Sequence, residues 1–433
     1  MPARSRAGTG NARQGSRSAA GYSTPSRKGL TVSLSTPSLP GRVRIRTVVD
    51  DRLHTTSACM GIRYGSRDDP DGLGGCAHLL EHLLMSAPLR EGASFCEYVE
   101  RLGGESNAQT GLETMLVHAQ VLPQDAGETV ERMLDAVLRP RLSRQLLDAE
   151  RSVVKQELLA AAADPSDTVQ DAFLAALFPG HPLGRPVGGT APGLDRLDLD
   201  AVIEQHAATL VTAPITLVVV GPELPSGLAD TAAPTTPTPT VPAPVPAHVP
   251  LPPVGGSDPP PPPGDDFHWM VMGARSPRAD VPDRAAYGVL AALLGSSSAS
   301  LLYRTVRNEH GLSYSFQAWD RGYREAGAWR ILIGAGPAEA DRVRKLVERL
   351  LGDVAAGRFT EADIDAARRQ ATMRLVVDRD NPLEYARRLA ESSCTRPDRT
   401  IDEECALIDG VAPEAVAAAA GRVMDDLVFV HRS

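Results

Sequence analysis

The sequence predicts an α+β protein with two duplicated α/β sandwich domains, each a sheet covered by helices, joined by a proline-rich linker. A chain of 433 residues is longer than one hydrophobic core usually serves. Strand-like and helix-like segments follow an order that broadly repeats in the two halves, which indicates an internal duplication. Between the halves, 16 of the 36 prolines fall within residues 222–263. That composition is typical of an extended linker with no core of its own.

The domain boundaries follow from these changes in composition. Residues 1–28 are rich in Ser, Arg, Gly and Ala and lack apolar periodicity, so we expect a disordered tail that is not a secretory signal. The first domain is expected at 29–222, the linker at 223–265 and the second domain at 266–433. A ligand for an SH3-type domain is the alternative interpretation of the linker.

Apolar periodicity and turn residues predict the elements of the first domain. In chain order they are strands at 30–34, 43–48 and 57–64, a turn at 65–72, helices at about 73–87 and 93–102, a hairpin at about 103–121, helices at 124–138, 143–164, 167–178 and about 198–210, and a strand at 215–220.

The second domain is predicted in the same way. Its expected elements are a strand at 267–272, a helix at 283–294, a second helix ending at Arg307, strands at 314–319 and 328–334, helices at 338–356, 361–378, 382–393 and 413–424, and a strand at 427–431.

Charge and cysteine content limit the partners and the compartment. The formal net charge is −9, and the six basic residues before Gly29 leave −15 for the remainder. An acidic body disfavours nucleic acid and mildly favours basic peptides, although a solvated surface explains it equally well. No apolar run reaches the length of a membrane helix. Five irregularly spaced cysteines without a Cys-x-x-Cys pair indicate reduced thiols and a cytoplasmic protein.

The motif His78-Leu-Leu-Glu81-His82 lies in the helix expected at 73–87. On a helix these three side chains share one face. Two imidazoles one turn apart can bind one zinc ion, and the carboxylate between them can take a proton from the water that zinc activates. The spacing is the inverse of the commoner His-Glu-x-x-His. Short motifs also arise by chance, so two ordinary surface histidines are the alternative.

A peptidase zinc site needs a third protein ligand. Glu150 and Glu157 are seven residues apart in an expected helix and therefore lie on one face. They suit one direct ligand and one outer-shell group, although solvent-facing charges are the usual role of such glutamates. Cys76 could also be a ligand, but a buried apolar role is expected for it.

Several motifs in order resemble one known family. They are His78-x-x-Glu81-His82, Asn107-Ala108-x-Thr110, Glu150-Arg-x-Val-Val-x-x-Glu157 and His181-Pro-Leu-Gly-Arg-Pro in the first domain, and Arg307-Asn-Glu-His-Gly-Leu-Ser-Tyr314 in the second. Together they resemble the pitrilysin/insulinase family (M16), and most of all its short two-domain branch, which includes the mitochondrial processing peptidases and bacterial relatives. The resemblance covers about residues 30–222 and 266–433.

The resemblance implies a role for each motif. It implies His78, His82 and Glu157 as ligands of one Zn²⁺ per chain, Glu81 as general base and Glu150 as an outer-shell group. Asn107 and Ala108 would lie on the strand along which a peptide substrate pairs, and Arg307 and Tyr314 would bind the substrate carbonyl and the developing oxyanion. The chain would be half of a clamshell, in which the Arg/Tyr pair faces the zinc site of another subunit. A homodimer, or a heterodimer with a related subunit, is therefore implied.

The expected function is that of a zinc metalloendopeptidase, a hydrolase that acts on short or unfolded peptides. Leader or precursor-peptide processing is one job that such an enzyme could do, although the sequence does not show it. The alternative is a non-catalytic partner subunit or peptide-binding scaffold of a heterodimeric peptidase. Such subunits typically lack part of the zinc set or the Arg/Tyr pair, and this chain retains both. Departures from the family pattern, such as Leu79 after the first histidine, remove no catalytic group.

Overall fold

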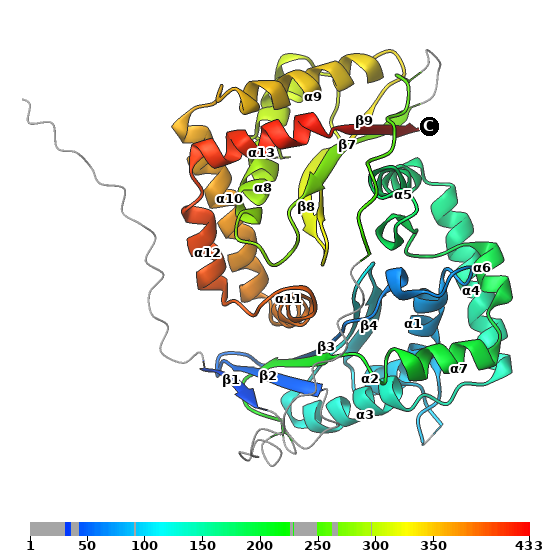
Figure 1. The fold of residues 1–433 in the computed structure, drawn as a ribbon. Helices are drawn as coiled ribbons and strands as arrows, with labels where there is room; N and C mark the ends of the chain where they lie inside the picture. The colour runs from blue at the N-terminus through cyan, green and yellow to red at the C-terminus, as the bar shows by residue number, and fades with distance from the viewer. Residues whose placement is uncertain are drawn as a thin grey trace, which may run out of the picture.

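The structure is a computed structural model that describes residues 31–35, 43–90, 92–225, 228, 249–261, 267–295 and 297–433. It contains a six-stranded and a four-stranded sheet, both covered by helices (Figure 1). This confirms the predicted fold class. The predicted tail and most of the predicted linker lie outside the described residues, and the domain boundaries remain predictions.

The first half of the chain carries the larger sheet. Its elements are β1 (Thr31–Ser35), β2 (Val43–Val49), β3 (Thr56–Ile62), η1 (Ser66–Asp68), α1 (Cys76–Ser86), α2 (Phe95–Arg101), β4 (Glu105–Thr110), β5 (Met115–Val121), η2 (Pro123–Asp125), α3 (Ala126–Leu138), α4 (Arg144–Ala162), α5 (Pro165–Leu177), η3 (Pro182–Gly184), α6 (Ala191–Arg196), α7 (Leu199–Ala208) and β6 (Ile215–Gly221).

The second half carries the smaller sheet. Its elements are β7 (His268–Ser276), α8 (Arg284–Leu294), η5 (Tyr303–Glu309), β8 (Phe316–Gly322), β9 (Gly327–Ala335), α9 (Ala340–Ala355), α10 (Glu361–Asp380), α11 (Pro382–Thr395), α12 (Ile401–Asp409), α13 (Pro413–Asp425) and β10 (Val428–Arg432).

The strand order records the duplication. The sheets run β1-β2-β6-β3-β5-β4 and β10-β7-β9-β8. The four strands β6-β3-β5-β4 correspond to β10-β7-β9-β8, and neighbours within each set are antiparallel. In this arrangement β4 and β8 are equivalent edge strands. The repeat that the sequence predicts is thus present in the topology.

In each half of the chain, one helix packs against the sheet of the other half (Figure 1). Helix α5 packs on β7 and β10, and α11 packs on β3 and β6. The approach of α11 is so close that a Cβ atom added to Gly61 would lie 2.5 Å from the carbonyl oxygen of Ala390. The two halves are therefore joined by packing as well as by the linker, because a helix from the other half covers part of each sheet.

A buried group of charges also joins the halves. Arg67 pairs with Glu113 of its own half and with Glu325 of the other, the latter at 2.5 Å. Glu113 also accepts hydrogen bonds from the backbone N–H of Arg324 at 3.0 Å and from its guanidinium at 3.0 Å. The Glu113 side chain is 2% exposed, so its charge depends on these cations rather than on water.

We expect Glu113→Gln to lower the free energy of unfolding by about 3 kcal/mol, because it leaves buried guanidinium charge short of a partner. Asp353→Asn, in an exposed pair with Arg358, is the matched control and should cost less than about 1 kcal/mol. Urea unfolding of the three proteins measures the difference. Equal midpoints for the two variants would contradict the assigned role of Glu113.

Several sequence expectations differ from the structure in detail. Helices α6 and α12 were not expected, although Thr400 and Glu403 cap α12 reciprocally, a pattern that the sequence contains. The predicted second helix of the second domain is a wider π-helical segment, η5. Tyr314 lies before β8 and not in it, so the strand expected at 314–319 begins two residues later.

Residues 249–261 of the predicted linker form neither helix nor strand. They are nonetheless packed, since Leu251 and Val254 contact the apolar cluster beneath α5. None of the helices in the described part of the chain is long and apolar enough to cross a membrane.

Candidate metal centre

Helix α1 presents the histidine motif, and its position is fixed at its first turn. Gly75 precedes the helix with φ of 100°, a conformation that favours glycine. A Cβ atom there would lie 2.9 Å from the carbonyl oxygen of Gly188. The Asp69 carboxylate accepts hydrogen bonds from the N–H groups of Gly75 at 2.7 Å and Ala77 at 2.8 Å. It thereby satisfies N–H groups that a helix start otherwise leaves free.

Asp69 is a positioning residue that the sequence analysis missed. It lies in the stretch expected to be a turn, and no local capping pattern marks it because it reaches α1 from before the N-cap. Its own position is held by the segment that follows η3, where Arg185 donates to the Asp69 carbonyl oxygen at 2.9 Å. Burial raises the pKa of the Asp69 carboxyl to about 7.

One face of α1 packs in the hydrophobic core, and the other carries the two histidines. Leu79, Leu80, Leu83 and Leu84 are fully buried in the core of the first half. His78 and His82 lie on the opposite face, partly exposed, with their ring centroids 4.9 Å apart. The apolar stripe thus fixes the rotation of the helix, and the histidines point towards α4.

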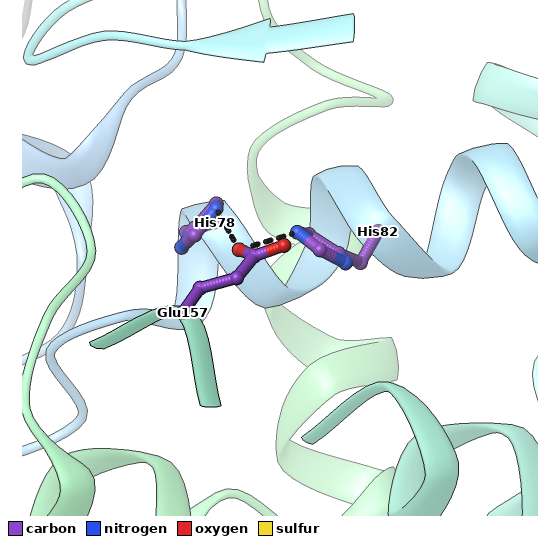
Figure 2. A group of neighbouring side chains, drawn as sticks. All are labelled: His78, His82 and Glu157. Carbon is purple, nitrogen blue, oxygen red and sulfur yellow. Dashed lines mark ion pairs between the residues drawn. The ribbon is translucent and has the colours of Figure 1, made fainter. Parts of the chain in front are cut away.

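Glu157 of α4 completes a group of three possible metal ligands, which we call the His–His–Glu cluster (His78, His82 and Glu157). Figure 2 shows both imidazoles converging on this carboxylate. Glu157 Oε2 lies 3.6 Å from His78 Nε2 and 3.3 Å from His82 Nε2. One ligand atom from each residue lies within 4.8 Å of the other two.

These separations fit zinc. Tetrahedral ligands about 2.1 Å from an ion lie about 3.4 Å from one another, close to the distances between Glu157 and the two imidazoles. The donors, two imidazole nitrogens and one carboxylate oxygen, are a set found at catalytic zinc, which keeps a fourth position open. The Glu157 side chain is 49% exposed, so this position can be reached from solvent.

Glu150 contacts the cluster through His82 and is not itself one of its three residues. Its Oε2 is 3.2 Å from His82 Nδ1, so a proton on Nδ1 would leave Nε2 free as the ligand atom. Its side chain is 15% exposed, less than that of Glu157. The two glutamates that share a face of α4 therefore differ in contacts, since Glu157 lies near both imidazoles and Glu150 near His82 alone.

We expect Glu150→Gln to weaken zinc binding roughly 10- to 100-fold, the usual loss when an outer-shell carboxylate is removed from a ligating histidine. Competition with a chromogenic chelator measures the affinity. Glu204→Gln, a variant of an exposed glutamate on α7, serves as control. Unchanged affinity in Glu150→Gln would show that the carboxylate does not orient His82.

Glu81 is partly buried on the same helix face. Burial lowers the pKa of His78, and the nearby Glu81 carboxylate is the largest opposing influence. Among the described residues no hydrogen bond or ion pair occupies the Glu81 carboxylate. Glu81 lies beside the cluster but is not one of the three possible ligands. A carboxylate that is not bound to the metal remains able to accept and donate a proton.

Edge strand β4 carries Asn107 and Ala108 and packs beside α1. Asn107 is exposed and stands opposite His118 of β5, while Ala108 is 8% exposed. In the described part of the chain, β5 is the sole strand paired with β4. The outer edge of β4 can therefore accept an added strand.

Arg307 and Tyr314 lie close together in the second half. The Arg307 guanidinium is 5.3 Å from the centre of the Tyr314 ring and also stacks over Tyr303. Tyr314 is 75% exposed. No hydrogen bond, ion pair or ring contact within the described ranges joins this pair to the His–His–Glu cluster. The structure of one chain thus brings the pair together but leaves it separate from the cluster.

The chain matches known sequences over most of its length. Residues 45–191 match the model of the insulinase family (peptidase family M16), and residues 196–371 match that of the peptidase M16 inactive domain. An uncharacterized zinc protease of Mycobacterium tuberculosis is 29% identical over 392 residues, covering 89% of this chain and 90% of the relative. A probable mitochondrial-processing peptidase subunit beta of Arabidopsis thaliana is 24% identical, covering 90% of this chain and 76% of the relative.

Solved structures share the fold. A protease from Helicobacter pylori superimposes with a TM-score of 0.79 at 17% identity, covering 93% of this chain and 99% of that chain. An M16-like peptidase from Alicyclobacillus acidocaldarius gives 0.76 at 16% identity, covering 94% and 98%. The matches to both halves, together with the inverted histidine motif, identify the chain as a member of the insulinase family of peptidases, M16.

Proposed function

We propose that the protein is a zinc-dependent endopeptidase that binds one Zn²⁺ per chain through His78, His82 and Glu157. The observation that carries this proposal is the convergence of the three side chains at spacings suited to one tetrahedral ion. Relatives named zinc proteases support it. Zinc bound there would polarise a peptide carbonyl and lower the pKa of water in the open position.

The residues around the cluster would complete hydrolysis. Glu81 takes up the proton of the attacking water and later delivers it to the departing amine. Glu150 holds His82 in the tautomer that presents Nε2. Arg307 and Tyr314 donate to the developing oxyanion. We assign this role to the pair of a second subunit, and the lack of a contact between the pair and the cluster within the described residues supports that assignment.

The proposed substrate is a short or unfolded peptide. A peptide that adds to the outer edge of β4 must be extended, and it is recognised mainly through its backbone. Asn107 and Ala108 line that edge beside α1. Leader or precursor-peptide processing in the cytoplasm, by a homodimer or a heterodimer with a related subunit, is the setting we propose.

Cleavage of a mixed library of unfolded peptides, read by mass spectrometry, tests this function. We expect cleavage by the purified full chain, its loss after chelation and its return with one equivalent of zinc. Zinc binding without cleavage, in the chain alone and in mixtures with related subunits, would contradict catalysis and favour the alternative, a non-catalytic partner subunit or scaffold.

A further inference from the structure

A cavity of about 850 Å³ lies between the two halves of the chain. Its walls include the end of β4, part of β8, Arg330 of β9 and part of α11. Its size is within the usual range of ligand-binding clefts. None of the three His–His–Glu cluster residues lines it, so it is a separate feature of the molecule.

One wall of the cavity holds a buried cation that forms no ion pair with any carboxylate of the described residues. Arg330 of β9 is 5% exposed, and no carboxylate oxygen of the described residues lies within 4.0 Å of its guanidinium nitrogens. Its Nε atom has no hydrogen-bond partner within the same residues. A buried charge in this condition is costly unless an anion joins it.

The neighbours of Arg330 include two rings and two carboxylates. The charges of Asp320 and Asp171 interact with Arg330, but neither carboxylate forms an ion pair with it. The Arg330 guanidinium lies 5.0 Å from the centre of the Trp319 ring and 5.5 Å from that of Phe173. Asp320 instead forms an ion pair with Arg284 at 2.9 Å and accepts a hydrogen bond from the Ser276 hydroxyl. Of the other arginines of the cavity wall, Arg388 pairs with Glu404 at 2.6 Å, while Arg374 and Arg399 are not buried and remain in contact with solvent. Arg330 is thus the buried cation in this wall that a ligand could engage.

The cavity also reaches the proposed catalytic site. Gln109 and Thr110, the last residues of β4, line it. So does Gly188, where an added Cβ atom would lie 3.8 Å from His78 Nδ1. A peptide paired with β4 beside the cluster would therefore direct one of its ends into this cavity.

We propose that the cavity binds a carboxylate of the peptide substrate, with Arg330 as its cationic partner. This proposal rests on the proposed function and adds a specificity to it. The fork of a guanidinium matches a carboxylate with two parallel hydrogen bonds. The carboxylate is either the C-terminus of the peptide or an acidic side chain. The overall charge of −9 does not attract such a group, so any preference must come from this site.

Matched peptides test the proposal. A peptide that the wild-type chain cleaves is made with a C-terminal acid or amide, and with each Asp or Glu replaced by its amide. We expect the favoured acid to raise kcat/KM roughly 10- to 100-fold over its amide, as for a hydrogen bond to a charged group. In Arg330→Met this ratio should fall to about one, and Arg330→Lys should restore part of it. Arg342→Met, an exposed control on α9, should keep the wild-type ratio.

A binding measurement separates this proposal from catalysis. In Glu81→Gln, which is expected to bind peptide without cleaving it, Trp319 fluorescence should respond to the acidic peptide, and the response should vanish in Arg330→Met and in Trp319→Phe. Cleavage of acid and amide at equal rates by the wild type would overturn the Arg330 proposal and leave the endopeptidase intact.

Two further outcomes are decisive. Absence of cleavage with Arg330-dependent binding of the acidic peptide would contradict the proposed function but support the carboxylate site. A fluorescence response to inorganic phosphate that depends on Arg330, with no discrimination between the acid and amide peptides, would indicate a free-anion site and overturn the assignment to substrate.

Discussion

Replacing Glu81 by Gln is expected to lower kcat/KM for peptide cleavage by about 10³-fold or more, near the upper part of the range for loss of a general base. Glu81 lies beside the His–His–Glu cluster but is not a member of it, so the amide keeps the shape of the side chain and removes only its ability to accept a proton. Zinc content should stay at one per chain, and the melting temperature should not change.

Steady-state kinetics on one cleaved peptide, with zinc measured in the same samples, check this expectation. Glu100→Gln, which changes an exposed glutamate of α2, is the matched control and should retain full activity. A Glu81→Gln protein that still binds zinc and cleaves at more than about a tenth of the wild-type rate would show that another group accepts the proton.

Replacing His82 by Ala should have the second largest effect, the loss of stoichiometric zinc. His82 contributes Nε2, 3.3 Å from Glu157, and also receives the orienting contact of Glu150. Without the His82 imidazole, only His78 and Glu157 remain as protein ligands, and Glu150 no longer has a ligating side chain to orient. We expect the affinity to fall by more than the roughly 10- to 100-fold that loss of an outer-shell group costs.

Metal analysis after dialysis against a weak chelator measures this loss. His54→Ala, a change at an exposed histidine, should leave zinc at one per chain. Circular dichroism should show the same helix content in both variants, because the leucine face of α1 is unchanged. Full zinc occupancy in His82→Ala would place the metal elsewhere.

The local part of the site could be predicted from sequence because it depends on helical spacing. His78, Glu81 and His82 share a face through a separation of one turn, and Glu150 and Glu157 share a face through two turns. The strands and most helices follow from the same periodicities. The repeated order of the predicted strands and helices also indicates the duplication from sequence alone.

The remaining features depend on contacts between distant segments. Asp69 stabilises α1 from outside its capping positions, and Arg67 pairs with Glu325 across a separation of 258 residues. The exchange of α5 and α11 between the sheets has no local pattern, because an apolar helix face does not specify which sheet it covers. The burial of Arg330 is likewise a product of packing, since a lone arginine in a strand is ordinarily exposed.

The separation of Arg307 and Tyr314 from the cluster has a related cause. Their sequence motif marks a chemical pair, and the structure brings the two side chains together. It contains one chain, however, and the resemblance implied that the pair acts on the zinc site of another subunit. Sequence therefore predicts the pair, while its placement against the zinc site of a second subunit is part of the proposed dimer.

Anomalous diffraction at the zinc absorption edge, from crystals of the full chain, would show directly whether the His–His–Glu cluster binds zinc. We expect one zinc per chain, bound by Nε2 of His78, Nε2 of His82 and a carboxylate oxygen of Glu157 at about 2.0–2.2 Å, with a non-protein ligand in the fourth position. Zinc bound by other residues, or no zinc at this cluster in crystals grown with the metal, would contradict this expectation.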